Sequence, residues 1–233
     1  MNNVSNINST PKLLIQSCLT LLFLICIAPA LLFLTAGTFS YWNVWLLTGT
    51  FFVLELYTII HLCLHDPALL QKRLQLKENE KTQQLFNIFI YIIIFLSVFI
   101  IPALDFKHNW SSIPLWIIFA AVITMIIGLW MVLLVMKQNK YSSRNIEIQE
   151  DQKVIDTGLY AIVRHPMYIF GIIAFCSMPL ILGSVYAFLL LLILCPLIFI
   201  IRILNEEKVL KENLKGYQEY TLKVKYRLIP FVW

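Results

Sequence analysis

One run of residues combines groups that could bind and act on a small ligand: GLYAIVRHPMY, at positions 158–168. Pro166 suits the first turn of a helix, so an apolar helix is predicted to begin there, with Arg164 and His165 just ahead of it. A helix start presents unpaired N–H groups and the positive end of the helix dipole. These features favour an anionic group, such as a carboxylate, on a bound ligand.

A second polar set lies further along the chain, where Arg202 and Glu206 are four residues apart and share one face of a helix. The apolar stretches between the two sets predict a helical hairpin, which would bring His165 and Tyr168 to the same mouth as Arg202 and Glu206. A cationic cofactor and a lipid-soluble substrate could meet there. Structural roles are also open: an interfacial salt bridge for Arg202 and Glu206, a helix cap for His165, and an aromatic belt for Tyr160 and Tyr168.

Glu55 and a histidine pair are further candidates. Glu55 lies near the centre of an apolar stretch, where an ionisable side chain is costly and suggests a function, such as contact with a substrate headgroup. A protonated Glu55 bonded to a neighbouring helix is the simpler alternative. His61 and His65 have a spacing compatible with a metal ion, but only Asp66 would complete the set. We therefore predict no metal site.

Membrane helices must carry these residues. Of the 233 residues, 60% are hydrophobic and only 13% are charged, against roughly 25% in a typical soluble domain. Several apolar stretches reach or approach the roughly 20 residues that cross a bilayer. We expect an all-α, polytopic transmembrane protein of about six spans, or five because the fifth stretch is short. The stretches are Leu13–Ala36, Val44–Leu64, Leu85–Leu104, Ile113–Met136, Met167–Leu182 and Val185–Ile201.

The basic residues predict the orientation. With the N-terminus inside, every Lys and Arg except Lys107 falls in an inner segment. Because a positive excess marks the cytoplasmic side, both termini are predicted to be cytoplasmic, and so is a pocket at the mouth of the C-terminal hairpin. The protein is then a multi-pass integral membrane protein, for which a bacterial inner membrane is a suitable location. The net charge of +5 favours contact with anionic membrane lipids, and no nucleic-acid partner is expected.

Other features narrow the function classes. All five cysteines lie in apolar stretches without a Cys-x-x-Cys pair, which argues against a disulfide framework and a zinc site. Polar residues gather at one membrane face and no internal repeat is visible, which weighs against a transporter. Two amphipathic segments are expected beside the membrane, a short helix within 66–84 and a charged helical segment within 205–225.

At these motifs the sequence resembles the isoprenylcysteine carboxyl methyltransferase and phospholipid methyltransferase family of membrane enzymes. The motifs that carry the resemblance are Asn139 with Tyr141 and Ser142, Ile148-Gln149, Gly158-x-Tyr160-x-x-x-Arg164-His165-Pro166-x-Tyr168, Glu206-Glu207, Gly216-Tyr217 with Tyr220, and Tyr226-Arg227-Leu228-Ile229-Pro230. We therefore divide the chain into an N-terminal four-span region, 1–136, and a C-terminal catalytic region, 137–233.

The resemblance implies S-adenosylmethionine as the cofactor, bound without a Rossmann domain, and no Gly-x-Gly-x-x-Gly occurs in the chain. The family's cofactor contacts fall on matching positions here: Gln149, Gln152, Lys153, Val154, Ile155, Tyr160, His165, Pro166, Met167, Tyr168 and Glu206. Arg202 falls where the family has a substrate-facing arginine. Arg202, Glu206 and His165 form the expected catalytic set.

The implied reaction is methyl transfer to a lipophilic acceptor that enters from the bilayer, either an isoprenylcysteine-type carboxylate, a lipid or another membrane-soluble molecule. Such an in-line displacement needs alignment and shelter from water. Arg202 would hold a carboxylate acceptor by paired hydrogen bonds, whereas an amine would lose a proton to Glu206 or His165. The alternatives are an NADPH-dependent reductase of the sterol-reductase type and a non-catalytic membrane protein. A homodimer is compatible with the sequence.

Overall fold

The computed structural model describes residues 10–74, 92–93, 95–142, 148–149 and 151–233. The expected all-α class is confirmed, because these residues form helices and no strand. Four helices are long and apolar enough to cross a membrane: α2 (Thr10–Ala36), α3 (Trp42–His65), α7 (Leu115–Gln138) and α9 (Val185–Asn213). A shorter apolar helix, α8 (Pro166–Ile181), precedes α9. The remaining elements are α4 (Pro67–Leu74), the π-helical turn η1 (Leu96–Ile100), α6 (Ile101–His108), the 3-10 turn η2 (Gly158–Ala161) and α10 (Tyr217–Lys223).

Two expected segments differ from the observed helices. The expected third span, Leu85–Leu104, lies partly outside the described residues, and its described end belongs to η1 and α6. The expected last span ends at Ile201, but α9 continues to Asn213. Glu, Lys and Leu favour the helical backbone, so a change from apolar to charged residues does not end a helix. The charged segment within 205–225 is therefore the end of α9 followed by α10, with Gly216 between them at φ +86°.

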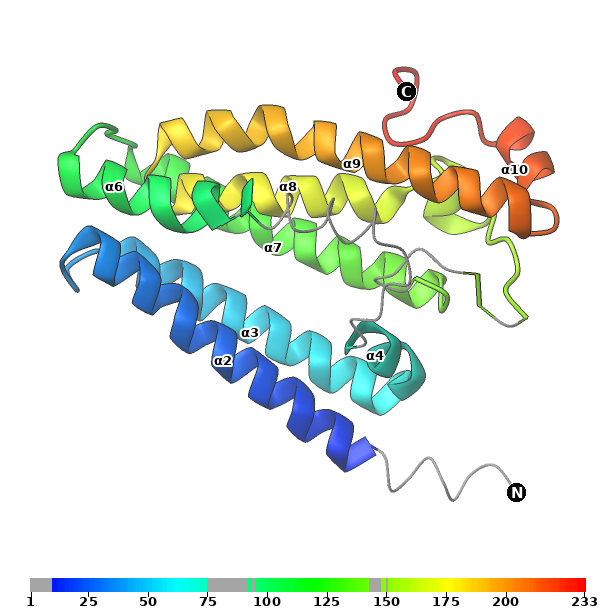
Figure 1. Ribbon diagram of the computed structural model, residues 1–233, viewed down its shortest axis with the longest axis horizontal. Helices are drawn as coiled ribbons and strands as arrows, with labels where there is room; N and C mark the ends of the chain where they lie inside the picture. Colours follow the sequence, from blue (N-terminus) through cyan, green and yellow to red (C-terminus); the bar gives the residue numbers. More distant parts are fainter. Residues whose placement is uncertain (1–9, 75–91, 94, 143–147, 150) are drawn as a thin grey trace.

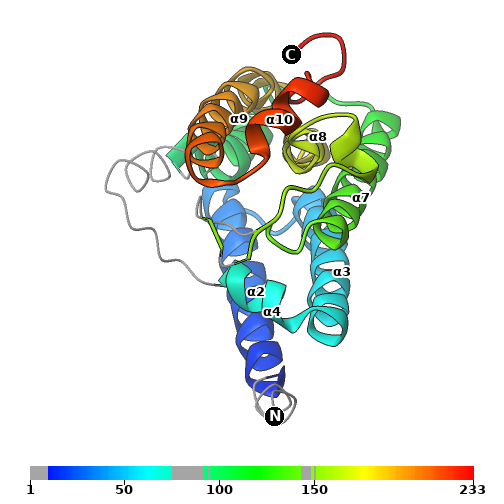
Figure 2. The same cartoon turned by 90° about the vertical axis from the view of Figure 1, so that its right-hand side faces the viewer.

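The helices are arranged in a bundle (Figures 1 and 2). α2 packs along α3, while α8 lies between α7 and α9. Gly128 of α7 permits an especially close approach to α8, because a Cβ there would lie 3.0 Å from the Phe170 carbonyl oxygen and 3.1 Å from the Ala174 Cβ. Small residues commonly allow such backbone contact between membrane helices. Helices α7 and α8 are therefore closely packed against each other.

One end of the bundle is held by buried polar contacts. The Asp105 carboxylate, 1% exposed, accepts hydrogen bonds from the Ser111 N–H at 2.7 Å and from the Ser184 hydroxyl at 2.6 Å. At the same end, Asn43 Nδ2 donates to the Ile181 carbonyl oxygen at 2.7 Å. These bonds tie α3 and α6 to the turn between α8 and α9.

The opposite end carries α4, η2, α10, the first turn of α2 and the C-terminal residues (Figure 1). The basic residues of these elements therefore share one end of the bundle, whereas Lys107 belongs to α6 at the other end. This distribution is the one that the topology prediction requires. The direction of the bundle across the membrane stays a prediction.

Candidate functional site

A pocket lies at the basic end, where residues after α7 meet the start of α8, the last turns of α9 and α10. Most of the predicted site residues line it: Gln152, Lys153, Val154, Ile155, Tyr160, His165, Met167, Tyr168, Arg202 and Glu206. The rest of the lining is Asn139, Tyr141, Ser142, Ile148, Arg164, Val209, Leu210, Leu214, Tyr217 and Tyr220. Segments that are far apart in the sequence thus converge on one cavity, as the hairpin prediction requires.

Two predicted cofactor contacts do not line this pocket. Gln149 instead shapes the preceding loop, because its N–H donates to Gln152 Oε1 and its side-chain amide donates to the Tyr141 carbonyl oxygen, both at 2.9 Å. Pro166 is the first residue of α8, as predicted. It sets the start of the helix, and its neighbours His165 and Met167 face the pocket.

Arg202 and Glu206 are connected through a residue of the neighbouring helix. The Tyr168 hydroxyl donates to Glu206 Oε2 at 2.5 Å and accepts from Arg202 Nε at 3.1 Å. The sequence placed these three side chains at one mouth, but did not show that the phenol lies between the cation and the carboxylate. This chain of hydrogen bonds orients two opposite charges at the pocket, one able to bind an anionic group and one able to bind a cationic group.

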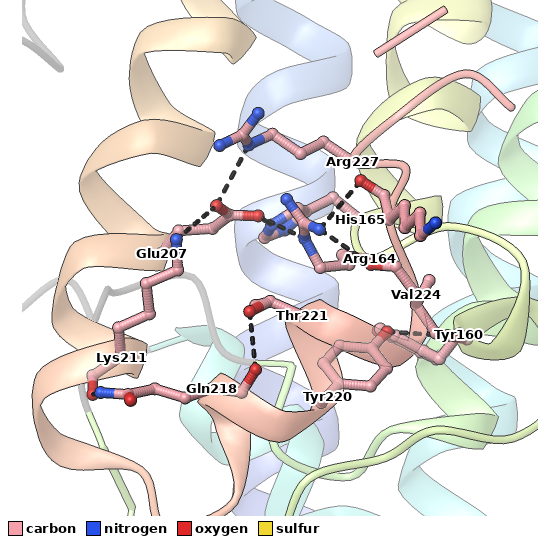
Figure 3. A network of polar contacts seen from close by, with 11 residues as sticks. Tyr160, Arg164, His165, Glu207, Lys211, Gln218, Tyr220, Thr221, Val224 and Arg227 are labelled. Carbon is pink, nitrogen blue, oxygen red and sulfur yellow. Dashed lines mark hydrogen bonds and ion pairs between the residues drawn. The ribbon is translucent and has the colours of Figure 1, made fainter. Parts of the chain in front are cut away.

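Behind the pocket wall lies a buried network centred on Glu207 (Figure 3). The Glu207 side chain is 3% exposed, and its carboxylate accepts from Arg164 Nε at 2.6 Å and from Arg227 Nε at 3.1 Å. His165 Nε2 lies 3.4 Å from the same carboxylate. Arg164 also donates to the Val224 carbonyl oxygen at 2.8 Å. Buried charges need such partners, so this network holds α9, the start of α8 and the C-terminal segment together.

Sequence reasoning assigned no role to Glu207 or Arg164, although both belong to the quoted motifs. Adjacent residues of a helix point about 100° apart, since 3.6 residues make one turn. Glu206 therefore faces the pocket while Glu207 points into the protein. The signal that could have separated their roles is the presence of several basic partners elsewhere in the motifs, namely Arg164 and Arg227.

The C-terminal segment covers the Arg-His-Pro motif from outside. The Arg164 N–H donates to the Tyr226 carbonyl oxygen, and the His165 N–H donates to the Arg227 carbonyl oxygen, both at 2.9 Å. These two N–H groups are therefore not available to an anionic ligand, which corrects part of the expectation for this helix start. Leu228 is buried in the same segment and packs in one cluster with Tyr168.

Gly158 has two structural reasons to be glycine. Its φ is +59°, in the left-handed region that disfavours a Cβ, and an added Cβ would lie 2.7 Å from Gln138 Oε1. That oxygen accepts a hydrogen bond from the Leu159 N–H at 3.1 Å. The glycine thus lets the chain close on the end of α7 and places η2, including Tyr160, at the pocket.

Tyr160 presents a phenol that stays protonated. Burial raises the pKa of Tyr160 to about 12, although a hydrogen bond from Asn139 lowers it, and the charge of Glu206 adds to the rise. Asn139 Nδ2 donates to this hydroxyl at 3.1 Å, and the Tyr220 hydroxyl donates to the Tyr160 carbonyl oxygen at 2.7 Å. The Tyr160 hydroxyl can therefore donate its own proton to a ligand at neutral pH.

Two buried hydroxyls of the pocket lack a partner. Within the part of the chain that the structure describes, Ser142 Oγ and the Tyr217 hydroxyl are buried and make no hydrogen bond. Both residues line the pocket. An unpaired buried hydroxyl is costly, so such groups call for an explanation. A polar ligand in this pocket would supply the missing partners.

Glu55, predicted to contact substrate, does not lie in this pocket. It lines a separate cavity between α2, α3, α4 and α7. His61 and His65 stack on each other with ring centroids 4.3 Å apart. Among the described residues, no group of three or more potential metal-binding side chains gathers around them.

A comparison with protein families bears on the helices that form the pocket. Residues 116–216 match the family model of phospholipid methyltransferases. This segment belongs to the phospholipid methyltransferase family. No curated protein matches the chain. The phospholipid methyltransferase segment runs from α7 to Gly216 and includes His165, Arg202 and Glu206, which confirms the family resemblance and indicates a membrane methyltransferase.

Proposed function

We propose that this protein transfers a methyl group from S-adenosylmethionine to a lipophilic acceptor, in the pocket at the basic end of the bundle. The observation that carries the proposal is the convergence of the family's cofactor positions on one cavity. Residues 152–155, Tyr160, residues 167–168 and Glu206 come from separate segments and all line it. The membrane methyltransferase family of residues 116–216 supports the same reaction class.

The charged and polar side chains of the pocket fit the chemistry of this cofactor. S-adenosylmethionine carries a positive sulfonium, an amino and a carboxylate group, and ribose hydroxyls. Glu206 would balance positive charge, and Lys153 would pair with a carboxylate. The unpaired hydroxyls of Ser142 and Tyr217 would bond polar groups of the cofactor. When bound, the cofactor supplies the electrophilic methyl group.

The protein's own residues would hold and shelter the acceptor. Arg202 projects a guanidinium at the mouth, where it would bind a carboxylate acceptor that needs no base. For an amine acceptor, the nitrogen would lose a proton as it gains the methyl group, and Glu206 is the better acceptor of that proton. His165 is the weaker candidate because its ring already contacts the buried Glu207 carboxylate at 3.4 Å.

The setting of the site is part of the proposal. The pocket would face the cytoplasm, because basic residues gather at its end of the bundle. The acceptor would enter sideways from the lipid, and membrane lipids would surround the apolar helices. A bacterial inner membrane and a homodimer are compatible with this arrangement, and both stay predictions.

The first test is calorimetric binding to the detergent-purified protein. S-adenosylmethionine and its demethylated product should bind with micromolar affinity, and NADPH should not. Glu206→Ala should weaken binding of S-adenosylmethionine at least about tenfold, as expected for loss of a charged partner. Glu212→Ala is the matched control, because Glu212 is exposed on the same helix and does not line the pocket. Absence of adenosyl-ligand binding to folded protein would refute the proposal, and binding of NADPH would favour the reductase.

A further inference from the structure

A second cavity of about 280 Å³ lies within the membrane part of the bundle, between α2, α3, α4 and α7. For scale, an engineered apolar cavity of about 150 Å³ binds benzene. Its walls are mainly apolar and include Leu21, Phe51, Leu62, Leu129 and Leu133. Most of the lining precedes residue 116, so it lies outside the segment that matches the methyltransferase family. The N-terminal helices therefore form a cavity that the family comparison does not explain.

Apart from Arg73, the polar side chains of this cavity can accept hydrogen bonds. Glu55 lines it, and the charge of Arg73, which lines the same cavity, acts on its carboxyl group. The hydroxyls of Ser17, Thr20 and Thr58 each donate to the backbone carbonyl four residues earlier, at 2.8 to 2.9 Å. Their protons are thus used, while their oxygen lone pairs remain. A carboxyl group accepts a hydrogen bond in either protonation state, so the cavity suits a ligand that brings a donor.

Arg73 lies in the wall between this cavity and the cofactor pocket. It lines the cavity, and its Nη1 donates to the Ser142 carbonyl oxygen at 3.2 Å and lies 3.9 Å from Met167 Sδ. Ser142 and Met167 line the cofactor pocket. The helix that carries Arg73 is anchored by Leu69 and Leu70, which are 1% and 5% exposed. A molecule that extends past Arg73 would therefore reach both spaces.

Helix α3 gives the distance from Glu55 to the part of the cavity that borders the cofactor pocket. Leu62 lines the cavity and packs in one cluster with Met167, which lines the cofactor pocket. Glu55 lies seven residues earlier on the same helix, which corresponds to about 10 Å at 1.5 Å per residue. The cavity also reaches the molecular surface beside α2, since Leu24 lines it and is 48% exposed. An acceptor could thus place one end at the pocket and its chain towards the bilayer.

We propose that this cavity binds the apolar body of the methyl acceptor, and that Glu55 accepts a hydrogen bond from an amine or hydroxyl group on that body. This donor group lies beside Glu55, about 10 Å along α3 from the end of the cavity that borders the cofactor pocket. The inference rests on the proposed function for the identity of the ligand, because the cavity itself requires only a lipophilic molecule with a hydrogen-bond donor. Glu55 would then select among membrane lipids, and Arg73 would guide the reacting end into the cofactor pocket.

The test is photolabelling of the full-length protein in lipid nanodiscs. Three probes share one diazirine-bearing alkyl chain and differ only in ending with an amine, a hydroxyl or a methyl ether. Mass spectrometry of the labelled peptides should place the amine and hydroxyl probes on α2, α3 and α7. Labelling by the ether should be about tenfold weaker, which is the fold-change expected for one hydrogen bond in an apolar site. Equal labelling by the ether would overturn the proposal.

Variants of Glu55 show whether the probes bind through a hydrogen bond to this residue or only by filling the cavity. Glu55→Leu should reduce labelling by the amine and hydroxyl probes to the level of the ether. Glu55→Gln keeps a carbonyl acceptor and should retain labelling by the hydroxyl probe. Val53→Leu is the matched control, since Val53 is 63% exposed on the same helix. Unchanged labelling of Glu55→Leu would also refute the proposal.

Binding of S-adenosylmethionine is measured on the same samples. Retained binding in each variant shows that the protein is folded and that the cofactor pocket is intact. If the wild-type protein labels as expected but binds no S-adenosylmethionine, the proposed function fails while the cavity assignment stands. If it binds the cofactor but does not discriminate among the probes, only the cavity assignment fails.

Discussion

The Glu207 carboxylate accepts a hydrogen bond from Arg164 Nε at 2.6 Å, with the two side chains 3% and 5% exposed. This ion pair joins the last turns of α9 to the residue two positions before α8. The Arg164 guanidinium also donates to two carbonyl oxygens of the C-terminal segment, those of Val224 and Lys225. One buried carboxylate therefore fixes the relative positions of three segments that border the pocket at the basic end of the bundle.

Breaking this pair should destabilise the whole C-terminal region. Arg164→Ala removes the closest partner of the buried Glu207 carboxylate, which keeps Arg227 at 3.1 Å, and loss of a hydrogen bond to a charged group costs about 1.5 to 3 kcal/mol. We expect a clearly lower Tm in detergent and loss of S-adenosylmethionine binding. Asp156→Ala is the control, because the ion pair of Asp156 with Lys223 is solvent-exposed, and its Tm should match wild type. An unchanged Tm for Arg164→Ala would show that the network does not hold the fold.

Tyr168→Phe tests the hydrogen-bond chain that joins Arg202 to Glu206. The ring should keep its stacking with His165 at 5.7 Å, so the variant should fold normally. Loss of the hydroxyl removes two hydrogen bonds to charged groups, each worth about 1.5 to 3 kcal/mol. We expect binding of S-adenosylmethionine or methyl transfer to fall at least about tenfold. Tyr57→Phe on α3 should change neither, and equal behaviour of the two variants would remove Tyr168 from the site.

The start of α8 and the hairpin could be predicted from the sequence because their causes are local. Pro166 begins the helix through its own backbone geometry, and the hairpin follows from two apolar stretches separated by a short turn. The convergence of His165, Tyr168 and Glu206 then follows from the hairpin. Local rules and one topological step therefore placed His165, Tyr168, Arg202 and Glu206 in the pocket, whereas Tyr160, Met167 and residues 152–155 were expected from the family resemblance.

The roles that the sequence could not predict depend on contacts between distant segments. Glu206 and Glu207 are adjacent and chemically identical, and only the packing of α9 against α8 decides which one faces the pocket. Likewise, the Arg164 and His165 N–H groups donate to carbonyl oxygens of the C-terminal segment, at Tyr226 and Arg227. These partners lie about sixty residues away in the chain. Periodicity and motif spacing carry no information about such pairings.

Gly158→Ala should displace the turn that carries Tyr160. The left-handed φ of +59° costs a residue with a Cβ about 1 to 2 kcal/mol, and the Cβ would also push against Gln138. We expect a lower Tm and weaker S-adenosylmethionine binding. Gly171→Ala on α8 is the control, because its Cβ would meet nothing within 4 Å, and its Tm should be unchanged or slightly higher. A similar loss of binding in both variants would contradict this explanation.

Tyr160 should make stability depend on pH in the alkaline range. Its pKa is about 12 in the folded protein and 10.0 without burial, so the folded state holds the phenolic proton more tightly. This contribution is present in full below about pH 10 and is lost as pH rises from about 10 to 12, with an upper limit of about 2.7 kcal/mol. Unfolding free energy should therefore fall less over this range in Tyr160→Phe than in wild type. If unfolding free energy falls equally with pH in the two proteins, the raised pKa of Tyr160 is contradicted.

The orientation of the bundle can be tested by labelling single added cysteines from either side of the membrane. Lys215 and Lys107 are both exposed. Lys107 belongs to α6, whereas Lys215 lies between α9 and α10, which meet at the opposite end of the bundle. Because basic residues remain on the cytoplasmic side, a membrane-impermeant maleimide should label Lys107→Cys in intact cells and Lys215→Cys only after the membrane is opened. The five native cysteines lie in apolar stretches and serve as the background. The reverse pattern would place the pocket outside the cell, where a cytoplasmic supply of S-adenosylmethionine could not reach it.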